Sequence, residues 1–183
     1  MLHPSWIELD AKALHKNIRY LKKRIGKERT FVSVIKGNAY GHGIEEFVPL
    51  AEAAGIRHFA VYDAFEAYRA LKVMRNDSHL IILGMLDEDQ MDWVIGNDIA
   101  FYVFEPERLQ AAITQARKAK KKALIHLELE TGMHRTGLEP QNLELAVAMI
   151  KKNSRYLKIE GICTHFAGAE SIANFARVQD QMT

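Results

Sequence analysis

One stretch of this chain reads Phe31-Val32-Ser33-Val34-Ile35-Lys36-Gly37-Asn38-Ala39-Tyr40-Gly41-His42-Gly43, an apolar run that ends at a lysine. The run is rich in β-branched residues, which predicts a buried strand, and the three glycines after Lys36 predict a turn. Parallel α/β proteins place their chemistry at the carboxyl ends of their strands. Lys36 is therefore predicted to be a site residue. The alternative is a lysine whose stem covers apolar surface while its ammonium stays in water.

Strands and helices alternate along the rest of the chain, which predicts a parallel sheet. The expected strands after the first are 58–62, 80–83, 100–104, 123–130 and 157–164, and the expected helices are 44–54, 64–74, 88–95, 106–120, 143–153 and one from 172. Before them we expect a short strand at 6–9 and a helix capped by Asp10 and ended by Gly26. No linker separates the units, so one domain with a short lead is expected.

Two architectures fit about six strand-helix units. An open doubly wound sheet would be complete, but its fingerprint Gly-x-Gly-x-x-Gly is absent. A closed (β/α)8 barrel needs eight units and typically about 250 residues, so this chain would hold only part of one.

Composition excludes several classes of protein. The 183 residues are 48% hydrophobic and 26% charged, as in an ordinary globular domain, and the net charge of +2 gives no footprint for nucleic acid. The single cysteine, Cys163, excludes an internal disulfide and fits a reducing compartment. No signal peptide or apolar span is visible, so a cytoplasmic protein without membrane contact is expected. The histidines lack metal-site spacing and no Gly-x-Ser-x-Gly is present, so neither a metal site nor a serine hydrolase is expected.

Three stretches resemble motifs of the alanine racemase family. Residues 34–43 are similar to the family's cofactor-lysine motif, which reads closely as V-K-A-N-A-Y-G-H-G. Residues 128–137, Glu-Leu-Glu-Thr-Gly-Met-His-Arg-Thr-Gly, are similar to K-[VI]-D-T-G-M-x-R-x-G. Residues 161–167, Gly-Ile-Cys-Thr-His-Phe-Ala, are similar to G-[LIV]-x-[TS]-H-[FL]-A. The resemblance extends over essentially the whole chain.

The resemblance implies a parallel (β/α)8 barrel of the TIM type, truncated to about six βα units. Residues 1–28 would be a lead strand and helix, 30–183 the barrel units of an N-terminal racemase domain, and the family's C-terminal β-domain would be absent from this chain.

The resemblance also implies a cofactor, pyridoxal 5′-phosphate, and a role for five residues. Lys36 would anchor the cofactor and move a proton on one face of the substrate. Tyr40 would reach the cofactor phosphate, and Leu83 would line its ring. Arg135 would reach the phenolic oxygen and lie beside the substrate carboxylate, and His165 would stack beside the ring. Without the resemblance, Arg135 would be a surface ion-pair partner and His165 a hydrogen-bonded strand-end histidine.

The implied activity is the isomerisation of L-alanine and D-alanine, which supplies D-alanine for peptidoglycan. The full-length protein would be a homodimer in which a tyrosine from the partner's β-domain serves the other substrate face, and this segment alone would be inactive. The alternatives are a serine, lysine or broad-specificity racemase, a non-catalytic barrel that binds the cofactor, and a structural domain.

The sequence departs from the family motifs at three positions. Gly37 stands where alanine is usual, a loss of one methyl expected to loosen the turn slightly. Glu128 replaces a lysine that is often carbamylated, and it could supply a carboxylate without modification. Glu130 stands where aspartate is usual and is one methylene longer.

Overall fold

The computed structural model describes residues 5–182. The backbone forms two compact units, Met1–Met85 and Leu86–Thr183, and each is described by itself.

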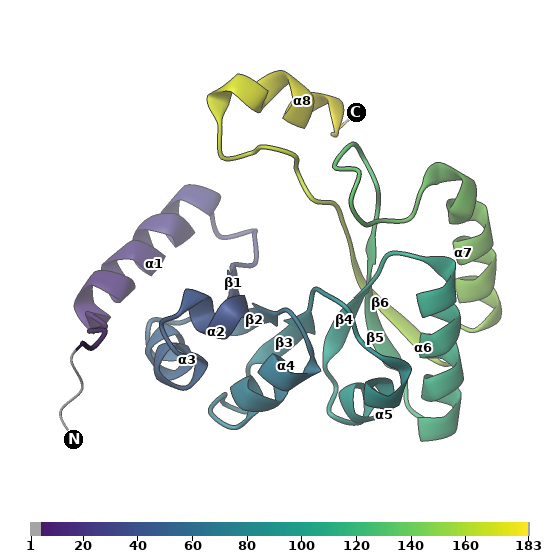
Figure 1. The fold of residues 1–183 in the computed structure, drawn as a ribbon, viewed down its shortest axis with the longest axis horizontal. Coiled ribbons are helices and arrows are strands. Elements are labelled where there is room, and N and C mark those ends of the chain that lie inside the picture. The colour runs from purple at the N-terminus through teal and green to yellow at the C-terminus, as the bar shows by residue number, and fades with distance from the viewer. Residues whose placement is uncertain (1–4, 183) are drawn as a thin grey trace. The chain divides into compact units, whose positions relative to one another are not determined.

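The first unit is a three-stranded parallel sheet with its connecting helices (Figure 1). Its elements are α1 (Ala11–Ile25), β1 (Val32–Val34), α2 (Lys36–Tyr40), α3 (Ile44–Ala53), β2 (His58–Val61), α4 (Ala64–Leu71) and β3 (His79–Ile82). Strand β2 lies between β1 and β3, with Val34 opposite Ala60 and Val61 opposite Ile82. The carboxyl ends of all three strands therefore lie at one edge of the sheet.

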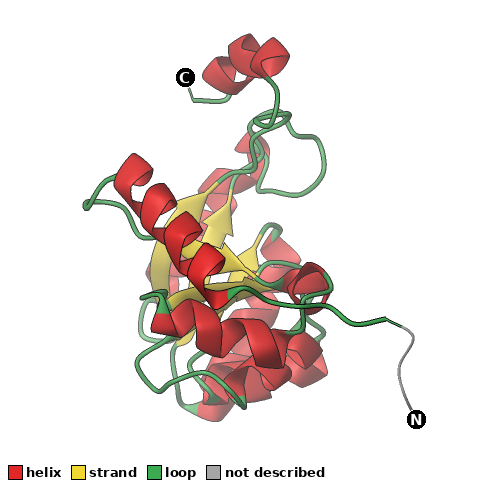
Figure 2. Ribbon diagram, turned by 90° about the vertical axis from the view of Figure 1, so that its left-hand side faces the viewer, coloured by secondary structure: helices red, strands yellow, loops and turns green. Residues whose placement is uncertain are grey.

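Helix α1 forms where its capping residues predict. The Asp10 carboxylate accepts the backbone N–H groups of Lys12 and Ala13 at 2.8 and 3.0 Å, and Gly26 ends the helix at a φ of 84°. The expected strand at 6–9 is not formed, and Figure 2 shows a loop there. Trp6 is 75% exposed, and residues 6–9 pair with no strand among the described residues. A strand needs a hydrogen-bonding neighbour, which alternation of side chains does not supply.

The second unit contains three further parallel strands with helices. Its elements are α5 (Glu88–Gly96), β4 (Ala100–Val103), α6 (Pro106–Ala119), β5 (Ala123–Glu128), α7 (Pro140–Lys152), β6 (Leu157–Cys163), the 3-10 turn η1 (Ile172–Asn174) and α8 (Phe175–Asp180). Helix α6 contacts both α5 and α7, and its buried face includes Leu109 and Ile113. Each expected strand and helix from 88 onward is present, with bounds that differ by a few residues.

A bulge in β6 changes which side chains share a face. Ile159 pairs with Ile125, but Gly161 pairs with His126, so Glu160 is an extra residue. A Cβ at Gly161 would lie 2.7 Å from His126 Nδ1, which shows that these two residues point to the same side. In a regular strand, Ile159 and Gly161 would point to the same side of the sheet. The extra residue, Glu160, breaks this alternation.

Candidate active site

The turn that follows β1 is left-handed, which the sequence did not predict. Gly37, Asn38, Ala39 and Tyr40 have φ angles of 63, 55, 54 and 53°, so α2 is a left-handed helical turn. Each non-glycine residue in this conformation costs roughly 1–2 kcal/mol, and asparagine tolerates it best. Gly37 is therefore the residue that this backbone favours. The expectation that glycine loosens the turn stays a prediction, and the positive φ adds a second effect, because here the missing methyl relieves strain.

Lys36 begins this turn at the carboxyl edge of the first sheet. Strand β1 ends at Val34, so Lys36 follows two residues after the strand and not within it. Val34 is 39% exposed, whereas the side chain of Ile35 is fully buried. Lys36 is half-buried, and its ammonium forms no hydrogen bond or ion pair with any residue in the described part of the chain. No side chain or backbone group among the described residues therefore holds this ammonium in place.

Two further predicted residues lie at the same edge of the first sheet. Tyr40 ends the left-handed turn and is 65% exposed. Leu83 directly follows β3, is half-buried, and donates its backbone N–H to the carbonyl of Val61 at 2.9 Å. The first unit therefore brings Lys36, Tyr40 and Leu83 to the carboxyl edge of one parallel sheet.

In the second unit, Glu130 shapes the loop that carries Arg135. Its carboxylate accepts the backbone N–H groups of Gly132, His134 and Arg135, the last two at 2.8 and 3.4 Å. Partial burial raises the pKa of Glu130, but these N–H groups outweigh it and leave the pKa below its ordinary value. Arg135 is exposed and lines a small cavity of about 220 Å³ together with Glu130. Glu130, which stands where the family usually has aspartate, therefore anchors the backbone of this loop.

Glu128 has a different environment from Glu130. It ends β5 opposite Cys163, and only 4% of it is exposed. It forms no ion pair with Arg135 in the described structure, so here Glu128 does not orient that arginine. Burial raises the pKa of the Cys163 thiol to about 11, with Glu128 contributing in the same direction. The thiol therefore stays protonated at neutral pH and is no nucleophile.

His165 lies two residues after β6, in an exposed position on its loop. A buried glutamine, Gln181, holds that loop. Its Oε1 accepts the N–H of Ala167 at 2.7 Å, and its Nε2 donates to the carbonyl of His165 at 3.0 Å and to the hydroxyl of Thr131 at 3.1 Å. Gln181 thus joins the loop after β5 to the loop after β6. Sequence reasoning placed a helix here but missed this role, because a lone glutamine at a helix end carries no local signal.

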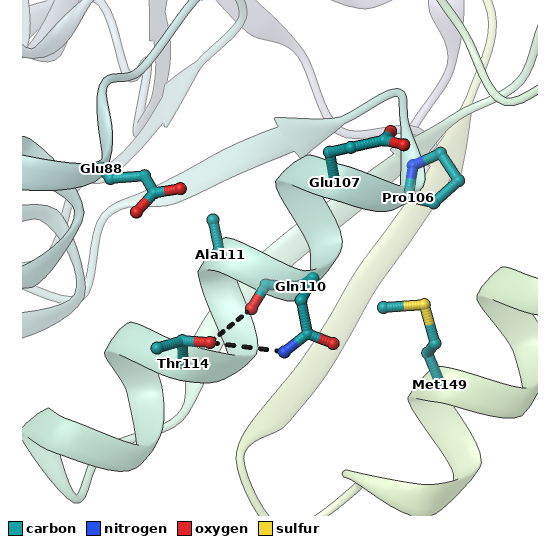
Figure 3. A pocket seen from close by; sticks show the side chains of 7 residues that line it. All are labelled: Glu88, Pro106, Glu107, Gln110, Ala111, Thr114 and Met149. Carbon is teal, nitrogen blue, oxygen red and sulfur yellow. Dashed lines mark hydrogen bonds between the residues drawn. The ribbon is translucent and has the colours of Figure 1, made fainter.

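A surface groove of about 420 Å³ in the second unit lies elsewhere (Figure 3). Helices α5, α6 and α7 line it, and it contains none of the five predicted residues. Two of its polar residues bond to each other, since Thr114 Oγ1 donates to the carbonyl of Gln110 at 2.9 Å and accepts from the Gln110 amide at 3.3 Å. Within residues 5–182 there is also no cluster of metal-binding side chains, and no helix long and apolar enough to cross a membrane.

Comparison with known proteins identifies the relatives of this sequence. A family model described as "Alanine racemase, N-terminal domain" matches residues 9–183. The alanine racemase of Campylobacter jejuni (strain RM1221) is 34% identical over 177 residues, which are 97% of this chain and 49% of that protein. The alanine racemase of Listeria monocytogenes serotype 1/2a (strain 10403S) is 30% identical over 92% of this chain and 45% of that protein. The chain therefore spans about half the length of these relatives.

Solved structures agree with the sequence comparison. The alanine racemase from Bacillus anthracis with bound L-Ala-P has a TM-score of 0.89 and 26% identity, covering 100% of this chain and 46% of its own. A histidine racemase from Leuconostoc mesenteroides subsp. sake, 23% identical with a TM-score of 0.84, covers 94% of this chain and 45% of its own, and shows a shared fold alone. These likenesses confirm the predicted fold class, a parallel α/β chain that makes up part of a (β/α)8 barrel.

Proposed function

This chain belongs to the family of alanine racemase N-terminal domains, and we propose that it supplies the lysine-bearing part of an enzyme that interconverts L-alanine and D-alanine. The observation that carries the proposal is Lys36, an amine without a partner among the described residues, at the carboxyl edge of a parallel sheet and within the family's lysine motif. Racemisation removes the proton from Cα on one face and returns one on the other. It therefore requires a basic group on each face.

The residues present fit a pyridoxal 5′-phosphate cofactor. Lys36 would hold the cofactor through its amine, which would bond to the aldehyde carbon with loss of one water. Tyr40 offers an exposed hydroxyl for the phosphate, and Leu83 offers an apolar side chain for the ring. When bound, this cofactor withdraws electrons from the substrate Cα and makes its proton removable.

The roles that we propose for the second unit follow from the chemistry of its exposed side chains. Arg135 is permanently charged and planar, which suits the carboxylate of an amino acid and the phenolic oxygen of the cofactor. The flat imidazole of His165 suits stacking beside an aromatic ring. Lys36 holds the substrate proton on one face of Cα after removing it. The loop of Arg135 follows the end of β5 and the loop of His165 follows the end of β6, which supports these assignments.

The group that serves the other face has no candidate in the family motifs of this chain. We propose that it is a tyrosine from a C-terminal β-domain of a partner subunit, so that the working enzyme is a homodimer. Residues 1–183 would then be the incomplete barrel domain of that enzyme. A cytoplasmic role in supplying D-alanine for peptidoglycan completes the proposal.

The first experiment tests attachment of the cofactor to the chain of residues 1–183. The chain is mixed with pyridoxal 5′-phosphate, reduced with borohydride and mapped by mass spectrometry. We expect a visible absorption band and a label on Lys36. Lys36→Ala should lose both, and Lys12→Ala, on the exposed face of α1, should keep them. A label spread equally over several lysines would contradict the proposal.

The second experiment tests the substrate with a longer protein that contains this chain and the remainder of the family domain. It is supplied with alanine, serine, lysine and histidine in turn. Preferential racemisation of alanine is the expected result. Preference for another amino acid would correct the substrate, and cofactor attachment without any racemisation would favour a non-catalytic binding protein.

A further inference from the structure

The geometry points to Glu66 as a positioning residue that holds the left-handed turn, and with it Lys36, in place for cofactor attachment. This inference rests on the function proposed above. It concerns the first unit alone, and in the described structure Glu66 forms no hydrogen bond or ion pair with Lys36 or Tyr40.

Glu66 lies in the first turn of α4, where a glutamate usually bonds back to its own helix cap. The cap is present, because the Asp63 carboxylate accepts the Glu66 N–H at 2.9 Å. The Glu66 carboxylate does not form the usual capping box, in which it would accept the N–H of the cap residue itself. One oxygen accepts the N–H of Tyr62 and the other accepts the N–H of Asn38, both at 2.9 Å. Glu66 therefore ties the loop after β2 to the turn after β1.

Asn38 is held from its side chain as well. Its Oδ1 accepts Arg69 Nη2 at 2.7 Å and the N–H of Ile44 at 3.2 Å. Arg69 is fixed in turn by two bonds to Glu45, at 2.8 and 2.5 Å. The hydrogen bond from Arg69 keeps the pKa of Glu45 below its ordinary value, so this pair stays charged at neutral pH. Helix α4 thus holds both the backbone and the side chain of one residue in the turn.

The turn needs such support because its conformation is strained. Asn38, Ala39 and Tyr40 all have positive φ, and a backbone of this kind persists only where its surroundings hold it. Lys36 precedes these residues and Tyr40 ends them, so relaxation of the turn would displace both side chains. Reactive groups lose effectiveness when they move by about 1 Å, which makes the support of the turn a determinant of reactivity.

Glu66→Gln is the informative substitution, since it keeps size and shape. The amide offers one acceptor oxygen, so one of the two backbone N–H groups must face an NH2 group instead. We expect the equilibrium constant for attachment of pyridoxal 5′-phosphate to Lys36 to fall about tenfold or more. Glu107→Gln is the matched control, because Glu107 also lies in the first turn of a helix, and it should leave attachment unchanged.

A second measurement needs no cofactor. Hydrogen exchange of the Asn38 amide, followed by NMR well below the unfolding temperature, should be at least about tenfold faster in Glu66→Gln. Exchange of amides in the core of β2 should be unchanged, which separates loss of the turn from general unfolding. Unchanged Asn38 exchange would overturn the inference.

The outcomes distinguish the inference from the function it rests on. If the unsubstituted chain does not attach the cofactor at Lys36, the proposed function fails. If it does, and Glu66→Gln attaches it equally well, the inference fails. Should Glu66→Gln not fold, Glu66→Asp gives an independent test, because it keeps the charge but draws the carboxylate back by one methylene from the N–H groups of Asn38 and Tyr62. It should weaken attachment similarly, and attachment like that of the unsubstituted chain would contradict the inference.

Discussion

The side-chain amide of Gln181 donates a hydrogen bond to the hydroxyl of Thr131 across 3.1 Å, joining residues that are 50 positions apart in the sequence. The same amide nitrogen reaches the carbonyl of His165 at 3.0 Å. Because Gln181 is buried, water does not compete well for these bonds. The loop after β5 and the loop after β6 are therefore held by one side chain from the end of α8.

Gln181→Leu should destabilise the chain. The substitution leaves the buried N–H of Ala167 without its partner, which costs roughly 1–3 kcal/mol, and it also removes the bond to the carbonyl of the exposed His165. The measurement is the free energy of unfolding from urea titration. The control is Gln179→Leu, two residues earlier and exposed, which should change stability by less than about 0.5 kcal/mol. Equal effects of the two substitutions would argue against the proposed role of Gln181 in joining the two loops.

Gly37→Ala should lower stability although it places the usual family residue in the motif. Nothing lies within 4 Å of a Cβ built at Gly37, so the cost comes from its φ of 63° alone, about 1 kcal/mol. Gly96→Ala is the control, since its Cβ also meets nothing within 4 Å and its φ is not positive. Alanine is favoured there at the end of α5. Opposite shifts in melting temperature are expected, and a stabilising Gly37→Ala would show that the turn is not left-handed in solution.

Glu130→Gln should make stability less dependent on acid pH. The pKa of Glu130 is lower in the folded chain than its ordinary value of 4.5, so its contribution is present above that value and disappears as pH falls through the folded pKa. The variant should therefore be less stable than the unsubstituted chain at neutral pH, and the difference should shrink in acid. Melting temperatures of both proteins across this range provide the test. A difference in melting temperature that stays constant or grows in acid would contradict the role of Glu130 as a backbone anchor.

The chain of residues 1–183 should not racemise alanine by itself, even with cofactor attached. In the proposed mechanism Lys36 serves only one face of Cα, and the chain spans about half the length of its relatives. The measurement is exchange of the alanine Cα proton in heavy water, with Lys36→Ala as the background. Exchange at a rate near that of a longer protein containing the whole family domain would show that this chain already holds both basic groups.

Much of the fold followed from local patterns in the sequence. Asp10 and Gly26 predicted the ends of α1, and the alternation of apolar runs with helical periodicity predicted every strand from β1 to β6. The strand expected at 6–9 is not formed. Alternation of apolar and polar side chains can be read from one segment, but a strand also needs a second segment to pair with. The bulge at Glu160 also escaped prediction, although the next residue, Gly161, is of the type that often marks a bulge inside a strand.

The sequence by itself determined the order of the elements and placed Lys36, Leu83, Arg135 and His165 after strand ends, because periodicity, caps and turn residues act over a few neighbouring positions. Only the tertiary structure decided the hand of the turn after Lys36 and the shape of the loops around Arg135 and His165. Those conformations depend on bonds between distant residues, Glu66 to Asn38 across 28 positions and Gln181 to Thr131 across 50. A backbone that is unfavourable locally persists only when such contacts hold it, and no local pattern records them.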